Sequence, residues 1–170
     1  MQLEKKIFKE VLVFKINKIF DKRGYFSETY NHKNLSKFFK CKFVLDAVSF
    51  NKKNVLRGIH FRNKHQQNKL IYVLDGKILD FVVDLRKNSK TYLQYKKITL
   101  SDKNRKALFI PKGFGHGFYV LSNTALVAYK LSDYYYKKYE KIIRWNDEKI
   151  KIMLPRNLTK KIILSSKDCD

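Results

Sequence analysis

The stretch KLIYVLDGKILDFVVD, Lys69 to Asp84, consists of two runs of aliphatic and aromatic residues on either side of Asp75-Gly76. Short runs rich in β-branched and aromatic residues are typical of strands, and Asp-Gly between two such runs favours a tight hairpin turn. The stretch therefore predicts two strands, Lys69–Leu74 and Lys77–Asp84, joined as a β-hairpin.

The same pattern of short apolar runs between turn residues extends over the rest of the chain. Further strands are predicted at Glu10–Ile16, Gly24–Tyr30, Lys42–Phe50, Val55–Phe61, Leu93–Leu100, Lys106–Ile110, His116–Leu121 and Ala125–Ser132, with turns at Lys87–Lys90, Ser101–Asn104, Pro111–Gly113 and Ser122–Thr124. One short helix is predicted over Asn34–Lys40, with Asn34 as its N-cap. The chain has 170 residues, 44% of them hydrophobic, and shows no repeat or internal boundary. We expect a single all-β domain over residues 1–170, a jelly roll or a similar barrel.

The formal net charge of +23, from 38 Lys and Arg against 15 Asp and Glu, raises the question of nucleic-acid binding. The lysines, however, are spread from Lys5 to Lys161 and form no basic tail, basic helix or known nucleic-acid-binding motif. We interpret the charge as a solvated lysine-rich surface that attracts anionic ligands in general, and expect no nucleic-acid partner.

Two cysteines, Cys41 and Cys169, have neither the number nor the spacing of a disulfide framework or a zinc site, which favours a reducing compartment. The first ten residues lack the apolar run of a signal peptide, and no window approaches the roughly 18 apolar residues of a membrane span. We expect a cytoplasmic protein without a membrane partner.

The segment VLRGIHF, Val55 to Phe61, places Arg57 and His60 inside an otherwise apolar predicted strand. Strict alternation puts these two side chains on opposite faces. A bulge or strand end at Gly58 would bring both to one mouth of the barrel, since glycine is where a strand most readily loses its register. On the pattern alone, a core histidine bonded to backbone is the simpler interpretation of His60.

His116, in IPKGFGHGF, lies among Gly113, Gly115 and Gly117, and these small neighbours leave its imidazole accessible to a ligand. A pair of His60 and His116 with a carboxylate would suggest a metal-binding barrel. The HxH pair with a following Glu that such barrels carry is missing, so we do not predict a metal site.

Five segments of the chain, taken in order, resemble the dTDP-4-dehydrorhamnose 3,5-epimerases, also called dTDP-4-keto-6-deoxyglucose 3,5-epimerases. These segments are VLRGIHF, NKLIYVLDGKILDFVVDLRKNS, LFIPKGFGHGFYVLS, AYKLSDYY and IRWND. The segment FDKRGYFSETYN, Phe20 to Asn31, is similar to the N-terminal nucleotide-binding stretch of that family. The resemblance runs from about residue 8 to about residue 168 and covers nearly the whole chain.

The resemblance implies a cupin-type double-stranded β-helix (jelly roll) with one or two short helices. It also implies a homodimer whose N-terminal strands cross to the partner, and a reaction without metal or dissociable cofactor. The substrate would be a nucleotide-linked 4-keto-6-deoxy sugar, inverted at C3, C5 or both next to the ketone, as a precursor of surface polysaccharide.

Such a reaction needs a base, a partner for the enolate oxygen and an acid on the opposite face of the sugar. By resemblance, His60 is the base, Asp168 is the carboxylate that orients it, Tyr129 delivers a proton to the other face, and Lys69 is the cation beside the enolate oxygen. Without the resemblance, Asp168 would be read as a solvated terminal residue and Tyr129 as core.

The resemblance also assigns residues that bind the nucleotide and the sugar. Arg57 and, from the neighbouring subunit, Arg23 would bind the diphosphate through charge-assisted hydrogen bonds. The remaining matched positions are Phe26 for base stacking, Glu28 for base hydrogen bonding, and Ser49, His116 and Tyr134 for the walls of the pocket.

The chain departs from the family in one region. Where the family usually has Gln-Asp-Asn, one residue and Ser before the VLRG strand, this chain has Leu45-Asp46-Ala47-Val48-Ser49, and Arg62 replaces a Gln after the histidine segment. A pocket that loses a hydrogen-bonding partner discriminates differently. An epimerase of C3 only or C5 only on another 4-keto nucleotide sugar, GDP-linked for example, therefore stays open. So do a non-catalytic sugar-nucleotide-binding cupin and a metal-dependent cupin isomerase or dioxygenase.

Overall fold

The structure, a computed structural model, describes residues 1–155, 158 and 161–169. Its strands are β1 (Gln2–Lys6), β2 (Leu12–Lys15), β3 (Ile19–Asp21), β4 (Gly24–Phe26), β5 (Leu45–Lys52), β6 (Leu56–Arg62), β7 (Lys69–Asp84), β8 (Tyr95–Ser101), β9 (Lys106–Ile110), β10 (Phe114–Leu131) and β11 (Glu140–Ile142). Short helices are α1 (His32–Leu35), the 3-10 helix η1 (Lys137–Tyr139) and α3 (Ser166–Cys169).

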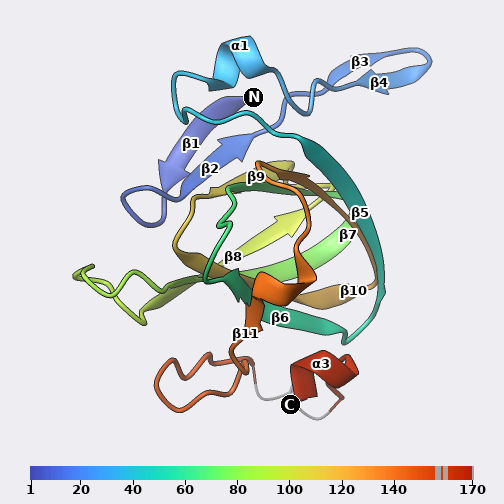
Figure 1. Cartoon of the computed structure of the whole chain (residues 1–170). Coiled ribbons are helices and arrows are strands. Elements are labelled where there is room, and N and C mark those ends of the chain that lie inside the picture. Colours follow the sequence, from blue (N-terminus) through green and yellow to red (C-terminus); the bar gives the residue numbers. More distant parts are fainter. Residues whose placement is uncertain (156–157, 159–160, 170) are drawn as a thin grey trace.

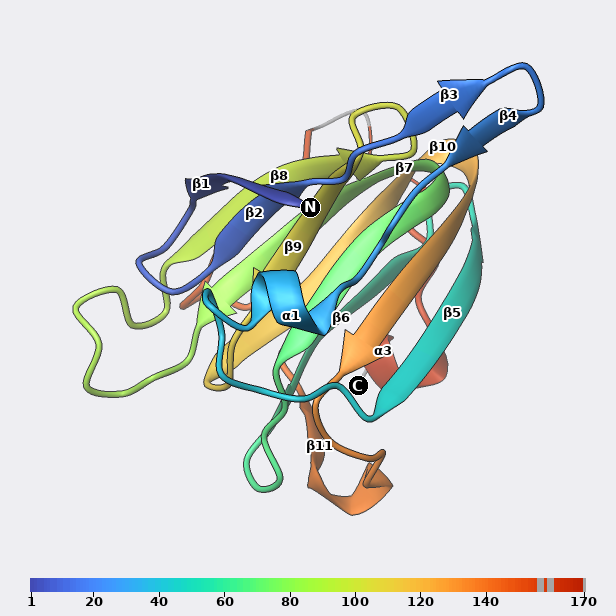
Figure 2. The ribbon, with the colours of Figure 1, turned by 90° about the horizontal axis from the view of Figure 1, so that it is seen from above.

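Nine of these strands form one antiparallel sheet that curls around the interior (Figure 1). Its order is β1-β2-β9-β7-β10-β6-β11, while β5 pairs with β10 and β8 pairs with β7. The remaining two strands, β3 and β4, form a separate hairpin, which Figure 2 shows projecting from the body. The expected all-β jelly roll with short helices is confirmed.

Strands β7 and β10 run beside each other along nearly their whole lengths, from Phe114–Asp84 pairing at one end to Leu131–Lys69 pairing at the other. The hairpin predicted at Asp75-Gly76 is therefore wrong, because Gly76 lies inside β7 at a register shift rather than in a turn. The φ of Gly76 is +85°, and a Cβ there would collide with the carbonyl oxygen of Thr124. The turn predicted at Ser122–Thr124 is wrong for the same reason, since β10 continues through it.

The predicted helix over Asn34–Lys40 begins and ends earlier, at His32 and Leu35. Asn31, not Asn34, caps it, because the side chain of Asn31 accepts a hydrogen bond from the Asn34 backbone N–H at 3.2 Å. The chain leaves the helix before Phe39, whose ring stacks on that of Phe109 with centroids 4.3 Å apart. This packing on β9 takes the place of further helical turns.

The buried side chains form three clusters. One fills the interior between the curled faces of the sheet, one packs beneath α1, and one lies under the segment that follows β11. They leave one end of the barrel open, where polar side chains from β6, β7 and β10 gather. Within the described part of the chain, no helix is long and apolar enough to cross a membrane.

Candidate active site

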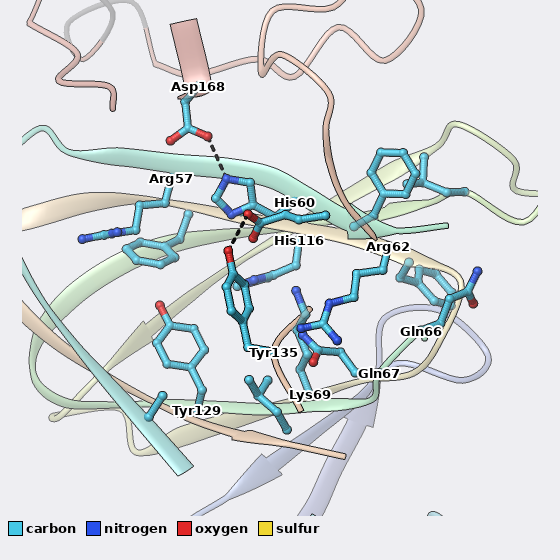
Figure 3. Close-up of a pocket in the computed structure, with 18 of the residues that line it drawn as sticks. Arg57, His60, Arg62, Gln66, Gln67, Lys69, His116, Tyr129, Tyr135 and Asp168 are labelled. Carbon is cyan, nitrogen blue, oxygen red and sulfur yellow. Dashed lines mark hydrogen bonds and ion pairs between the residues drawn. The ribbon is translucent and has the colours of Figure 1, made fainter. Parts of the chain in front are cut away.

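The open end of the barrel forms a cavity of about 710 Å³. This volume is typical of a pocket for a small-molecule ligand. Many of the residues predicted from the sequence line it: His60, Asp168, Tyr129, Lys69, Arg57, His116 and Ser49. Figure 3, which labels all of these except Ser49, shows the labelled side chains reaching into the cavity from several strands and from α3.

Gly58 places Arg57 and His60 on the same side of β6. His116 of β10 pairs with His60, whereas Phe118 pairs with Arg57, so β6 holds one extra residue in between. The φ of Gly58 is +94°, and a Cβ there would lie 2.6 Å from the carbonyl oxygen of His116. The bulge predicted at this glycine is confirmed. It interrupts the alternation of side chains that would otherwise place Arg57 and His60 on opposite faces.

His60 and Asp168 form a hydrogen-bonded pair in which Nε2 of His60 donates to Oδ1 of Asp168 at 2.7 Å. The Asp168 side chain is 2% exposed and that of His60 29%. The hydroxyl of Ser165 donates to the second carboxylate oxygen at 2.8 Å. Each carboxylate oxygen therefore accepts a hydrogen bond, and these two bonds hold the group against the imidazole.

Backbone hydrogen bonds between the C-terminal segment and β6 bring Asp168 close to His60. The N–H of Leu56 donates to the carbonyl of Ile163, and the N–H of Ile163 donates to the carbonyl of Asn54, each at 2.9 Å. This parallel bridge ties the C-terminal segment to the start of β6. The four-residue helix α3 then carries Asp168 over the ring of His60 (Figure 3).

The dyad leaves one imidazole nitrogen free to act as a base. Burial of Asp168 opposes its ionisation, but hydrogen bonds from His60 and Ser165 outweigh burial, and the pKa of Asp168 is lowered. An ionised carboxylate on Nε2 holds the hydrogen at that nitrogen and leaves Nδ1 to accept a proton. The arrangement can remove a weakly acidic proton from a ligand in the cavity.

Lys69, at the start of β7, supplies a positive charge inside the cavity. Burial lowers the pKa of Lys69 to about 8, and the positive charge of Arg62 also lowers it. The negative charges of Asp80 and Glu140 act to raise it. Lys69 is still mostly protonated at neutral pH. A compact ammonium at this place can stabilise a developing oxyanion.

His116 is buried, and its Nε2 shares a hydrogen bond of 2.8 Å with Oδ2 of Asp80. Burial raises the pKa of Asp80 and lowers that of His116, so the pair resists carrying separate charges. Asp80 was not among the predicted site residues, although an acidic residue within the apolar run KILDFVVD was a usable signal. Its Oδ1 has no hydrogen-bond partner within the described structure.

Tyr129 of β10 faces the cavity and shares a hydrogen bond of 3.1 Å with the hydroxyl of Ser49 on β5. Burial raises the pKa of Tyr129 to about 12, although the hydrogen bond of Ser49 and the positive charge of Arg57 act to lower it. Tyr129 is therefore protonated at neutral pH and can deliver a proton. In Figure 3, Tyr129 and His60 enter the cavity from opposite sides.

Four predicted residues lie outside the cavity of their own chain. Phe26 is 70% exposed on the β3–β4 hairpin, where the guanidinium of Arg23 pairs with Asp21 at 2.6 Å. Glu28 accepts a hydrogen bond from the Asn31 side chain at 2.9 Å. Tyr134 is exposed, and its neighbour Tyr135 lines the cavity instead.

The departures from the family lie partly in the cavity wall. Ala47, Val48 and Arg62 line it, whereas Leu45 does not. Arg62 is buried, and its guanidinium donates to the carbonyls of Tyr134 and His65 at 2.8 and 3.3 Å. Arg62 therefore fixes the loop that carries Tyr134, beside Lys69.

Among the described residues, no group of three or more His, Cys, Asp or Glu side chains could hold a metal ion.

Comparison with known proteins identifies close relatives. A family model described as dTDP-4-dehydrorhamnose 3,5-epimerase matches residues 5–170. The dTDP-4-dehydrorhamnose 3,5-epimerase of Methanothermobacter thermautotrophicus is 43% identical over 149 residues, which cover 87% of this chain and 80% of that protein.

Solved structures of 3,5-epimerases also match this chain. The dTDP-6-deoxy-D-glucose-3,5-epimerase of Legionella pneumophila in complex with dTDP-4-keto-L-rhamnose matches with a TM-score of 0.94 and 36% identity, covering 99% of this chain and 89% of that chain. The dTDP-4-dehydrorhamnose 3,5-epimerase of Bacillus anthracis with TDP and PPi bound matches with a TM-score of 0.92 and 37% identity, covering 98% and 95%.

Proposed function

The chain belongs to the dTDP-4-dehydrorhamnose 3,5-epimerase family, and we propose that it inverts the carbons beside the ketone of a dTDP-linked 4-keto-6-deoxy sugar. The observation that carries this proposal is the His60–Asp168 pair on one side of the cavity with Tyr129 on the other and Lys69 in the same space. A pocket that only binds sugar nucleotides has no need of an oriented base and an opposed acid.

In the proposed reaction, Nδ1 of His60 takes the proton from the carbon next to the ketone. The electron pair of the C–H bond moves to the ketone oxygen, and the resulting enolate is stabilised by the ammonium of Lys69. Tyr129 then gives its proton to the opposite face of the same carbon, which inverts it. Asp168 stabilises the imidazolium form of His60 meanwhile, as a carboxylate does beside a general-base histidine.

Arg57 is the proposed anchor for the diphosphate. Arg57 is an exposed residue that lines the cavity, and its guanidinium can form charge-assisted hydrogen bonds to phosphate. The relative from Legionella pneumophila holds dTDP-4-keto-L-rhamnose and that from Bacillus anthracis holds TDP and pyrophosphate. The same ligand class is proposed for this chain, with Ser49 and His116 in the wall of the sugar pocket.

A homodimer completes the proposed site. The β3–β4 hairpin exposes Ile19, Phe20, Tyr25 and Phe26, each by more than half of its surface. Val48 and Phe50 on β5 are exposed to a similar degree. Apolar surface of this extent on a projecting arm and a neighbouring strand favours contact with another protein surface. A second copy whose arm crosses to the partner's cavity would bring Arg23, Phe26 and Glu28 to the nucleotide.

One observation favours a narrower second candidate. The cavity wall carries Ala47 where the family usually carries an asparagine, and Arg62 where it usually carries a glutamine. Fewer hydrogen-bonding partners for the sugar favour inversion of one carbon only, or a different 4-keto nucleotide sugar. The product would in either case serve as an activated sugar for surface polysaccharide, made in the cytoplasm.

Proton exchange tests the proposal. The purified protein is incubated in deuterated water with dTDP-4-keto-6-deoxyglucose and, separately, with GDP- and CDP-linked 4-keto sugars, and NMR follows C3 and C5. We expect deuterium at C3, C5 or both with the dTDP sugar. Incorporation at one carbon alone supports the second candidate, and no incorporation with any of these sugars refutes the proposal.

A further inference from the structure

Asn51, on β5, lies between the proposed phosphate anchor and the proposed acid. Its side chain is buried, with 2% of the residue exposed, and it is not among the residues that line the cavity. Its Oδ1 accepts a hydrogen bond from Nε of Arg57 at 2.6 Å. Its Nδ2 lies 2.9 Å from the hydroxyl of Ser49, which in turn lies 3.1 Å from the hydroxyl of Tyr129.

The orientation of the Asn51 amide follows from its neighbours. A guanidinium nitrogen can only donate, so the amide atom that faces Arg57 must be the oxygen. A backbone carbonyl can only accept, and Nδ2 lies 3.0 and 3.2 Å from the carbonyls of Ser49 and Ala125. Both ends of the amide therefore demand the same orientation, with the NH2 group toward Ser49.

This orientation gives the Ser49 hydroxyl a defined role. Since Nδ2 of Asn51 donates to that hydroxyl oxygen, the hydroxyl hydrogen remains free to be donated to Tyr129. Tyr129 can then direct its own hydrogen into the cavity. After the proton has left, the tyrosinate keeps the hydrogen bond of Ser49, which stabilises the anion.

We propose that Asn51 is a positioning residue that couples diphosphate binding at Arg57 to proton delivery by Tyr129, through the hydroxyl of Ser49. A nucleotide that aligns the guanidinium of Arg57 also fixes the Asn51 amide, and the amide fixes the donor direction of Ser49. Chains of hydrogen bonds in a low-dielectric interior reinforce one another in this way. The inference rests on the proposed epimerase function and adds a residue that touches neither substrate nor reacting atoms.

The test measures two quantities for the full-length protein. One is the dissociation constant for dTDP, from calorimetry. The other is the ratio of inverted product to deuterated, uninverted substrate with dTDP-4-keto-6-deoxyglucose in deuterated water. This ratio reports how often an enolate is protonated by Tyr129 rather than returned by His60.

For Asn51→Ala we expect dTDP to bind about tenfold more weakly, which is the scale of losing one hydrogen bond to a charged group. We expect the ratio of inverted product to deuterated substrate to fall about fivefold, which is the scale of losing one neutral hydrogen bond. Asn51→Asp has the same shape and keeps an acceptor for Arg57 but cannot donate to Ser49, so it should lower the ratio even if Asn51→Ala fails to fold. Ser49→Ala should lower the ratio as well, and the double variant Ser49→Ala/Asn51→Ala should lower it no further, since the two residues act in one chain.

Asn104→Ala is the matched control. Asn104 makes a comparable set of side-chain hydrogen bonds, to Ser101, Lys106 and Thr99, in the turn between β8 and β9 away from the cavity. It should lower thermal stability and leave both measured quantities unchanged. If both Asn51 variants match Asn104→Ala in the two quantities while the wild type turns over normally, the coupling is refuted and the epimerase proposal stands. A wild type without proton exchange would instead refute the epimerase proposal.

Discussion

Replacing Asp168 by Asn tests the proposed role of the dyad, because the change keeps the shape of the side chain and removes its charge. The 2.7 Å contact with Nε2 of His60 is retained as a neutral hydrogen bond at best. The imidazolium that forms when His60 takes a proton then lacks its counter-charge. Proton removal should slow, whereas binding of dTDP should not change.

The size of the effect follows from the geometry. At an effective dielectric constant of about 20, unit charges 2.7 Å apart attract by roughly 6 kcal/mol, which is an upper limit for the loss. A hydrogen bond to a charged group exceeds a neutral one by about 1 kcal/mol, which is a lower limit. A loss of about 3 kcal/mol lies between them and corresponds to a rate about 100-fold lower.

The assay is the initial rate of deuterium incorporation into dTDP-4-keto-6-deoxyglucose, followed by NMR at saturating substrate. Asp75→Asn, the same substitution at an exposed residue outside the cavity, is the control and should keep the wild-type rate. A folded Asp168→Asn variant that loses less than about threefold would show that the carboxylate does not stabilise the imidazolium, and the dyad reasoning would be wrong.

Further changes probe the acid, the cation, the dimer and the absence of a metal. Tyr129→Phe should lower the rate of completed inversion far more than the rate of deuterium incorporation. Equal losses in these two rates, both measured by NMR, would contradict its role as acid. The rate of exchange should fall as pH rises through about 8, where Lys69 loses its proton, and Arg62→Gln should move this fall to higher pH because a neighbouring positive charge is removed. An unmoved profile would contradict the link between Arg62 and Lys69. Phe50→Lys should shift the proposed dimer toward monomer in light scattering, and an unchanged mass would place the interface elsewhere. Treatment with EDTA should leave the rate unchanged, and a loss restored by a divalent cation would point to a metal enzyme.

Local sequence signals were reliable for most strands and for the turns at Lys87–Lys90, Ser101–Asn104 and Pro111–Gly113, and misleading at two other predicted turns. The strand predicted at Lys106–Ile110 has these bounds in the structure, and that predicted at Val55–Phe61 is displaced by one residue. Asp75-Gly76 and Ser122–Thr124 have the residues of turns but lie inside strands. A glycine with positive φ serves a bulge as well as a turn, so only the pairing of β7 with β10, which is a long-range contact, decides between them.

In the candidate site, too, local sequence indicated some features, and long-range contacts decided others. The bulge at Gly58 could be inferred from residue types, because a glycine between Arg57 and His60 was visible in the sequence. The place of Asp168 could not, because it depends on the bridge between Val55 and Ile163, 108 residues apart, and only the family resemblance pointed to it. Asn51 gave no signal, since a buried amide that joins two functional side chains looks like any polar strand residue.

The central claim is that His60 removes the proton next to the ketone, and His60→Asn tests it most directly. The measurement is deuterium incorporation at C3 and C5 of dTDP-4-keto-6-deoxyglucose, made on a variant shown by calorimetry to bind dTDP like the wild type. We predict no detectable incorporation at either carbon. Incorporation at both carbons at a rate close to that of the wild type would contradict the account.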